Sequence, residues 1–257
     1  MADTAAPQMY HYHAHGHGLS ARFNRPVQQL IEVQAATSLP TIGGHGNSRV
    51  DDFKFKEFVS FKSAYSHVSG SQKEDGAYTT LVSSTIEGLN VMDMVTADRI
   101  VARLAARHPS GHEEPHILVL GSKFENLQIA GCPIHVELDH ELFMRLDTFA
   151  AIGKELASND DFRKMAEDPF QTGHPRKPAD AHGVVLCSLV KNMKATCPGV
   201  TRKGHAFIVP EFGKVFVAEM LSKHSTRTLT MLRIEMGSPT GGFVAAGEGG
   251  INGSNWP

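Results

Sequence analysis

The stretch STIEGLNV, residues 84–91, recurs with the same pattern as SKFENLQI at residues 122–129. Both begin with serine, place apolar residues at the third, sixth and eighth positions, and carry glycine or asparagine at the fifth. Two further copies fit this pattern, SRVDDFKF from Ser48 and, more loosely, SLVKNMKA from Ser188. One short phrase is therefore repeated along the chain.

The spacing of the apolar residues in this phrase fits neither a regular strand nor a helix. A strand brings every second residue to the same face, whereas these residues follow steps of three and then two. The fifth position holds Asp52, Gly88, Asn126 and Asn192, and these residue types tolerate a positive φ better than others. The pattern predicts a strand with a bulge or a corner, and a left-handed residue at that position.

The segments that follow the phrase also have β character. FVSFKSAYSHV follows the first copy, MVTADRIVARLAARH the second and PIHVELD the third. The second of these could form a turn of helix, but its context favours a strand. Two more alternating runs, GHAFIVPEFGKVFVAEML and TRTLTMLRIEMG, lie in the C-terminal half. We therefore predict a mainly β fold, a sandwich or barrel-like body built from repeated bulged strands.

Nine apolar residues of these strands are expected to be buried together. They are Phe53, Phe55, Ile86, Leu89, Phe124, Leu127, Ile129, Leu229 and Ile234.

One stretch departs from the β pattern. From Asp139, a predicted N-cap, apolar residues recur at three- and four-residue steps, and Ser158 or Asn159 can cap a second short helix that ends before Pro169. We predict a helical insertion at about 139–168 that covers part of the β body, with a lid over a binding site as the alternative.

The chain is predicted to divide into five segments. They are a His-rich N-terminal tail at 1–18, a first half of the β body at 19–137, the insertion and a Pro-rich connection at 138–182, a second half at 183–238, and a Gly-rich C-terminal tail at 239–257.

Length and charge limit the classes of function. A chain of 257 residues can form one large β domain or two smaller ones. The formal net charge is −2 and the basic residues are scattered, so we predict no nucleic-acid partner. No apolar run is long enough to predict a membrane span. The N-terminus lacks the basic and apolar regions of a secretory signal, which leaves a cytoplasmic protein, a mature form or another export route open.

The three cysteines, Cys132, Cys187 and Cys197, do not form a disulfide framework. If the chain from Cys187 to Cys197 is one extended run, its ends lie roughly 33 Å apart and cannot be bridged. We expect three buried free thiols. The alternative is a disulfide between Cys132 and one of the other two cysteines.

The order of features along the chain is distinctive. GLS at Gly18 comes first, STIEGLNVMDMVTAD and GSKFENLQIAGCPIHV follow, and GKVFVAEML with TLTMLRIEM closes the chain. This order resembles the choice-of-anchor P group of bacterial surface-associated proteins, whose members repeat a Ser-x-apolar-x-Asn-Leu-x-apolar phrase and a Val-Thr-Ala-Asp step. The resemblance covers most of the chain outside the helical insertion. It implies a β-rich exported body at the bacterial cell surface and no particular activity, but the chain shows no export signal or C-terminal anchor.

Histidine has the most distinctive distribution of any residue type. Fifteen are present, and His11, His13, His15 and His17 alternate in HYHAHGHG. In an extended chain all four rings face one side, an arrangement that could chelate zinc, nickel or copper. An ordered edge strand that packs on its neighbour is the alternative.

A second polar cluster contains His135, Glu137, Asp139 and His140. Along a strand, residues 135, 137 and 139 share a face, where carboxylates beside histidine could hold a metal ion or exchange protons. A strand edge that faces solvent explains the same pattern, and we favour it.

The sequence contains no recognised catalytic motif. The nucleophile elbow, the phosphate-binding loop and the HExxH metal site are all absent from it. We therefore expect a non-enzymatic structural, surface or self-assembling protein. The alternatives are a metal-binding protein or metal-dependent enzyme, and a glycan-binding β-sandwich. The terminal segments are expected to associate subunits into an oligomer or filament, with packing on the chain's own body as the alternative. The predicted interface residues are Tyr10, Tyr12, Phe243, Ile251 and Trp256.

Overall fold

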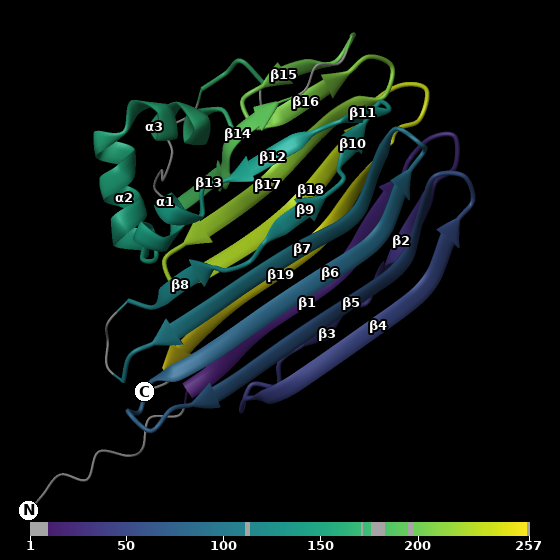
Figure 1. Ribbon diagram of the computed structural model, residues 1–257. Coiled ribbons are helices and arrows are strands. Elements are labelled where there is room, and N and C mark those ends of the chain that lie inside the picture. Colours follow the sequence, from purple (N-terminus) through teal and green to yellow (C-terminus); the bar gives the residue numbers. More distant parts are fainter. Residues whose placement is uncertain (1–9, 111–113, 171, 176–182, 195–197, 256–257) are drawn as a thin grey trace, which may run out of the picture.

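The computed structural model consists of two large antiparallel sheets packed face to face (Figure 1). It describes residues 10–110, 114–170, 172–175, 183–194 and 198–255. The prediction of a mainly β sandwich with a helical insertion is confirmed, and the sheets do not close into a barrel.

The first sheet has nine strands. Its order is β15 (Thr201–Lys203), β16 (Ala206–Val209), β17 (Gly213–Lys223), β18 (Thr226–Met236), β19 (Gly242–Asn255), β1 (Tyr10–Phe23) and β2 (Gln29–Gln34), while β13 (Val184–Ser188) also pairs with β17 and β3 (Thr37–Ser38) with β1.

The second sheet has eight strands. Its order is β11 (Cys132–Pro133), β10 (Gln128–Ile129), β7 (Val95–His108), β6 (Tyr78–Val91), β5 (Val59–Gln72) and β4 (Gly44–Phe55), while β8 (His116–Val119) and β9 (Lys123–Glu125) also pair with β7. A separate two-stranded sheet is formed by β12 (His135–Leu138) and β14 (Val190–Lys194).

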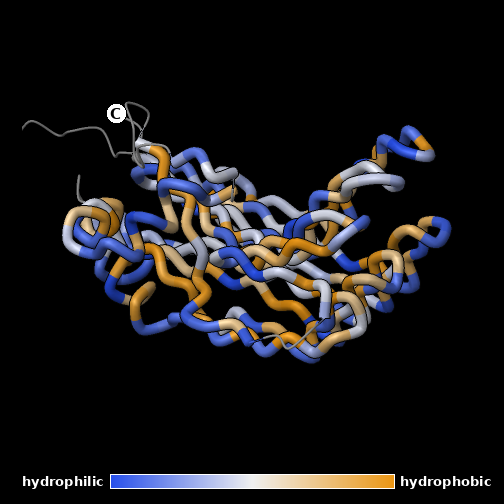
Figure 2. The backbone as a smooth tube through the Cα atoms, turned by 90° about the horizontal axis from the view of Figure 1, so that it is seen from above, coloured by the Kyte–Doolittle hydropathy of each residue, from blue (hydrophilic) through white to orange (hydrophobic). Residues whose placement is uncertain are grey.

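The hydrophobic core lies between the two layers, where β1 and β19 face β5, β6 and β7 (Figure 2). The predicted core is largely correct. Six of the nine predicted residues are buried, and Phe53, Phe55 and Phe124 are partly buried against them.

The repeated phrase marks the place where a strand changes which of its two faces packs against the core. Alternate residues of β6 are buried up to Ile86, and the alternation restarts at Leu89. Gly88 lies between them with a φ of 65°. Even-numbered residues are buried before Gly88 and odd-numbered residues after it. The apolar residues are therefore three positions apart at this point instead of two. The unusual spacing in the sequence is thus explained.

The same change of face crosses the whole eight-stranded sheet in one row. Asp52, Gly88 and Asn126 have φ values of 53°, 65° and 49°, which confirms the prediction of left-handed residues. Lys62 and Asp98 lie between them in the cross-strand pairing. We call these five residues the first switch row. The pairing register is the same on both sides of the row, so the predicted bulge, which would insert a residue, is absent.

A second switch row crosses the nine-stranded sheet. Ala218, Gly247 and Ala35 have φ values of 51°, 64° and 53°. Met231 and Gly18 lie between them in the pairing, again without a shift in the β17–β18, β18–β19 and β1–β19 registers. In each sheet the strands therefore exchange their buried face along a single line.

The fourth copy of the phrase does not belong to either row. Asn192 lies in β14 and is not among the residues with positive φ, so the prediction for this residue is wrong. The irregularity there is a register shift between β12 and β14, next to Glu137 and Leu138.

The described parts of the two predicted terminal tails, residues 10–18 and 242–255, belong to central strands. β1 pairs with β19 along its whole length, from Tyr10 opposite Asn255 to Phe23 opposite Gly242. β19 lies between β18 and β1 in the middle of the sheet. The division of residues 10–18 and 242–255 from the β body is therefore wrong. These strands complete the core instead.

The helical insertion covers one end of the sandwich (Figure 1). Asp139 accepts a hydrogen bond from the Leu142 amide at 3.0 Å, and Asn159 accepts one from the Phe162 amide at 3.1 Å, as the predicted caps require. Phe143 and Ile152 are buried in the common core, which favours the cover interpretation over a lid. No helix in the described part of the chain is both long and apolar enough to span a membrane. The helices are α1 (His140–Arg145), α2 (Phe149–Ser158) and α3 (Asp160–Glu167).

Candidate functional site

The four alternating histidines lie on the outer face of β1, as their spacing predicts. His13 and His15 are exposed, and His11 and His17 are half-buried. Within the described ranges, however, no three histidine, cysteine or carboxylate side chains converge as a metal site would require. Nor does β1 lie at a sheet edge, since it pairs with β19 on one side and with β2 and β3 on the other.

The second predicted cluster is also dispersed. Glu137 forms an ion pair with Lys191 at 3.4 Å, from Nζ to Oε1. His135 lies on an exposed position of β12, while His140 begins α1. The structure gives these three side chains no common ligand position among the residues that it describes.

The residues predicted to form a subunit interface lie mostly inside the core. Tyr10 and Tyr12 are buried between the sheets, and the Tyr10 ring stacks on Tyr78 with centroids 4.1 Å apart. Ile251 is also buried, while Phe243 is 38% exposed. Tyr10, Tyr12 and Ile251 are therefore unavailable to another subunit. Trp256 lies outside the described residues.

The cysteines differ from the expectation of three free thiols. Cys132 is disulfide-bonded. Cys187 is a buried free thiol, and burial raises its pKa to about 12, so it is not a reactive thiolate. Cys197 lies outside the described residues.

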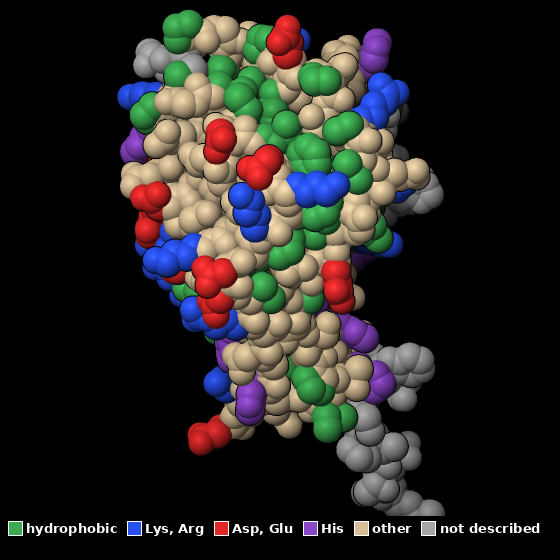
Figure 3. All heavy atoms as spheres, turned by 90° about the vertical axis from the view of Figure 1, so that its right-hand side faces the viewer, with side chains coloured by type: hydrophobic (Ala, Val, Ile, Leu, Met, Phe, Trp, Pro, Cys, Tyr) green, Lys and Arg blue, Asp and Glu red, His purple; other side chains and the backbone are tan. Residues whose placement is uncertain are grey.

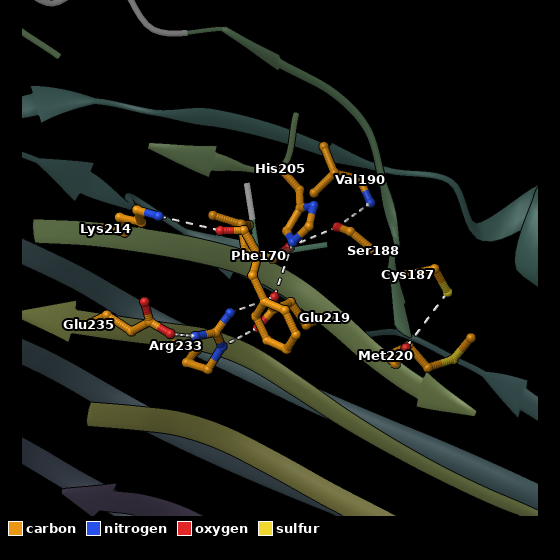
Figure 4. Close-up of polar contacts among 11 residues, drawn as sticks. Phe170, Cys187, Ser188, Val190, His205, Lys214, Glu219, Met220, Arg233 and Glu235 are labelled. Atoms are coloured by element: carbon orange, nitrogen blue, oxygen red, sulfur yellow. Dashed lines mark hydrogen bonds and ion pairs between the residues drawn. The ribbon is translucent and has the colours of Figure 1, made fainter. Parts of the chain in front are cut away.

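The most deeply buried acid of the nine-stranded sheet forms a charge cluster that the sequence analysis missed (Figure 4). Glu219 of β17 receives a hydrogen bond from Arg233 of β18, with Nη2 2.9 Å from Oε1. His205 Nε2 lies 3.1 Å from the same oxygen. The Arg233 guanidinium also lies 3.7 Å from the centre of the Phe216 ring and faces Phe170.

The partners of Glu219 keep it ionised despite burial. Burial acts to raise the pKa of Glu219, but the hydrogen bonds from Arg233 and His205 outweigh this effect and lower it. Both carboxylate oxygens are occupied, since Arg233 also donates to Oε2. These contacts connect β17, β18 and the His205 segment through one buried carboxylate.

A polar row continues from this cluster across the sheet. Glu219 pairs with Thr230, Thr230 with Glu248, and Glu248 with His17. Thr230 Oγ1 donates to Glu248 Oε2 at 2.8 Å, and His17 Nδ1 lies 4.0 Å from Glu248 Oε1. Burial lowers the pKa of His17, which Glu248 acts to raise. The row runs beside the second switch row on the outer face.

A second buried cation lies nearer the helices. Arg227 of β18 is almost fully buried, and its Nη1 donates to the Ile117 carbonyl at 3.0 Å. Burial lowers its pKa to about 10, so it stays charged at neutral pH. This arginine is enclosed by the fold and is inaccessible to a ligand.

An open groove of about 860 Å³ lies at the side of the sandwich where the ends of both sheets meet the small β12–β14 sheet. It combines an apolar floor with a basic rim, and none of its described lining residues is acidic. The lining residues are Phe124, Asn126, Leu127, Gln128, Pro133, Ile134, His135, Val136, Met193, Lys194, Val200, Arg202 and Phe207. His135 is the one predicted site residue that belongs to it.

A sequence signal for the Glu219 cluster was present. Glu219 is the only charged residue in the run VFVAEML, residues 215–221. An acid within an apolar strand is buried only with a partner, so this position indicates an ion pair. The partner could not be identified, because Arg233 and His205 come from other segments.

A family model described as "Domain of unknown function (DUF8256)" matches residues 10–223. The chain belongs to the DUF8256 family. The matched region ends at the last residue of β17, whereas the sheet of this DUF8256 protein continues through β18 and β19 back to β1. No curated protein and no solved structure gives a match.

Proposed function

We propose that this protein is a self-associating structural component of a cell surface, in which copies pair along one open side of the sandwich. The observation that carries this proposal is the presence of two adjacent open strand edges, β2 and β4, on that side (Figure 1). Among the described strands, β2 pairs only with β1 and β4 only with β5. Unpaired strand edges are templates for pairing with another chain.

The side chains beside these edges support association. Leu30 and Val33 of β2 are 71% and 45% exposed, and Ile42 before β4 is 84% exposed. Phe53 and Phe55 of β4 are only partly buried. Figure 3 shows hydrophobic side chains in a band along this side, with acidic and basic groups around them. Burial of such apolar surface in a contact would be favourable.

A second copy of the chain is the partner that best suits this surface. β4 carries both charge signs, with Arg49 and Lys54 beside Asp51 and Asp52. An identical edge would therefore offer charges of both signs and the missing main-chain hydrogen bonds. Pairing of like edges would close a dimer, while pairing of β2 with β4 of the next copy would continue as a filament.

A surface location is supported by two further features. Disulfides persist in oxidising compartments, and Cys132 is disulfide-bonded. The resemblance to the choice-of-anchor P group also implies export. We include the surface location in the proposal on these grounds.

The test is the mass of the full chain, measured by sedimentation velocity over a wide concentration range. The wild-type protein should form dimers or larger species as concentration rises. Leu30→Lys and Val33→Lys should shift the population towards monomer, because each places a charge in the proposed contact. Met144→Lys is the matched control, since Met144 is 49% exposed on α1, away from these edges.

Thermal unfolding of every variant verifies that it is folded. A wild-type protein that stays monomeric throughout contradicts the proposal. Equal assembly of the Leu30→Lys and Met144→Lys variants contradicts it as well, because the contact would then lie elsewhere.

A further inference from the structure

We propose that the groove beside β12 and β14 binds an amphipathic anion, a small molecule with one apolar tail and an anionic head group such as a carboxylate. The groove lies at the opposite ends of the sheets from β2 and β4, so this inference is independent of the proposed self-association. Its volume of about 860 Å³ lies within the range of about 300–1,000 Å³ that is usual for small-molecule sites.

The floor of the groove is part of the hydrophobic core. Leu127, Met193 and Phe207 line it, and each is at least nine-tenths buried. Val136 and Val200 are partly buried and form its accessible apolar surface. An apolar tail placed against these side chains would leave water without disturbing the fold.

The lining of the groove includes two cationic side chains. They are Lys194 and Arg202, and the described lining residues include no aspartate or glutamate, although the whole chain has a net charge of −2. Within the described residues no ion pair joins either of them to an acid, whereas the nearby Lys191 pairs with Glu137 at 3.4 Å. A cationic rim above an apolar floor favours an anionic head group over a cationic one.

The position of Arg202 is fixed without neutralising its charge. Its Nη1 donates to the Met193 carbonyl at 2.8 Å, and its Nε donates to the Gly204 carbonyl at 2.9 Å. These contacts connect β15 to β14 and hold the guanidinium at the rim. An anion that arrives there meets a charge whose place is already set, which lowers the entropic cost of binding.

The experiment is calorimetric titration of the full chain with decanoate, below the concentration at which decanoate forms micelles. Two comparison ligands are used. Decyltrimethylammonium has an alkyl tail of similar length but a cationic head group, and acetate has no long tail. We expect saturable one-site binding of decanoate, binding of the cation at least about tenfold weaker, and no detectable binding of acetate.

Two variants locate the site. Lys194→Glu should weaken decanoate binding by about tenfold or more, while Lys154→Glu, a change of the same charge on the exposed face of α2, should leave it unaltered. Val136→Trp should abolish binding by filling the groove. Because Val136 is only partly buried, thermal unfolding can verify that this variant remains folded.

Four results would overturn the proposal. They are the absence of saturable binding, equal affinity for the cationic ligand, equal effects of the two lysine substitutions, and binding that begins only when micelles form.

Discussion

Gly247 of the nine-stranded sheet lies directly against Ile100 of the eight-stranded sheet: a Cβ atom at Gly247 would come within 3.0 Å of Ile100 Cγ2. Gly18, its cross-strand neighbour, is as close to the opposite layer, since a Cβ there would lie 2.6 Å from the Ala64 Cβ. At Gly18 and Gly247 the second switch row therefore meets the other sheet through residues without side chains. The close approach of the two layers depends on these glycines.

Replacement of Gly247 with alanine should destabilise the protein. The residue has a φ of 64°, where a side chain costs about 1–2 kcal/mol, and the contact with Ile100 adds to this cost. Urea unfolding should show a free energy of unfolding lower by about 2 kcal/mol or more. Gly153→Ala is the control, because this exposed helical glycine has open space around it and alanine there should stabilise by up to about 1 kcal/mol. Equal stability of the Gly247→Ala protein and the wild type would contradict the role of the row.

Removal of Arg233 should be more costly than removal of the whole ion pair. Arg233→Met leaves the Glu219 carboxylate buried without its main partner, which should lower the free energy of unfolding by about 3–5 kcal/mol. Glu219→Gln combined with Arg233→Met should lose less, because no buried charge is left alone. The four proteins of this double-mutant cycle can be compared by chemical unfolding. Additive effects would show that the two side chains act independently, against this interpretation.

Acid should weaken the fold through His108. This side chain packs 5.1 Å from the Tyr10 ring, between centroids, and burial lowers its pKa to about 4 from an ordinary value of 6.5. Between these pH values the unfolded chain binds a proton that the folded chain does not, so stability should fall as the pH drops through this range. The difference corresponds to about 3 kcal/mol in total and is fully developed only below the lower pKa.

The contribution of His108 can be isolated with two substitutions. His108→Phe keeps an aromatic ring beside Tyr10 and removes the titrating group, so its stability should decline less between pH 6.5 and 4 than that of the wild type. His45→Gln, at an exposed position of β4, should follow the wild type. Parallel pH profiles for the wild type and His108→Phe would show that the acid sensitivity arises elsewhere.

The sequence contained enough information for the first switch row. The apolar steps of three and two, together with Gly88 and Asn126 at the same position, led to the correct left-handed residues. Of the two predicted mechanisms, a bulge or a corner, the bulge is wrong, because a change of face in an unbroken register leaves the same local spacing as an inserted residue. Only the pairing partners, such as Lys62 opposite Gly88, distinguish the two.

The second switch row left almost no local signal. Two of its left-handed residues are Ala35 and Ala218, and alanine has no preference for that conformation. The pairing of β1 with β19 was missed for a related reason. It joins segments from opposite ends of the chain, and His- and Gly-rich composition near a terminus is also typical of unstructured tails.

The alternation of the histidines correctly predicts that their side chains lie on one face of a strand. Side chains two residues apart on a strand are about 7 Å apart, whereas ligands of one zinc ion lie about 2 Å from it. Convergence therefore requires rotamers or a partner strand that the spacing cannot specify. The Glu219 cluster shows the same limit, because its three side chains come from three separate segments.

The pairing of Tyr10 with Asn255 determines how the molecule would bear a mechanical load. Force applied between these two residues would break the hydrogen bonds of the β1–β19 pair one after another, starting at Tyr10 and Asn255. Force applied at one of them and at the β4 edge would instead act across many strands at once. We therefore expect a lower unfolding force between Tyr10 and Asn255 than between Tyr10 and the β4 edge.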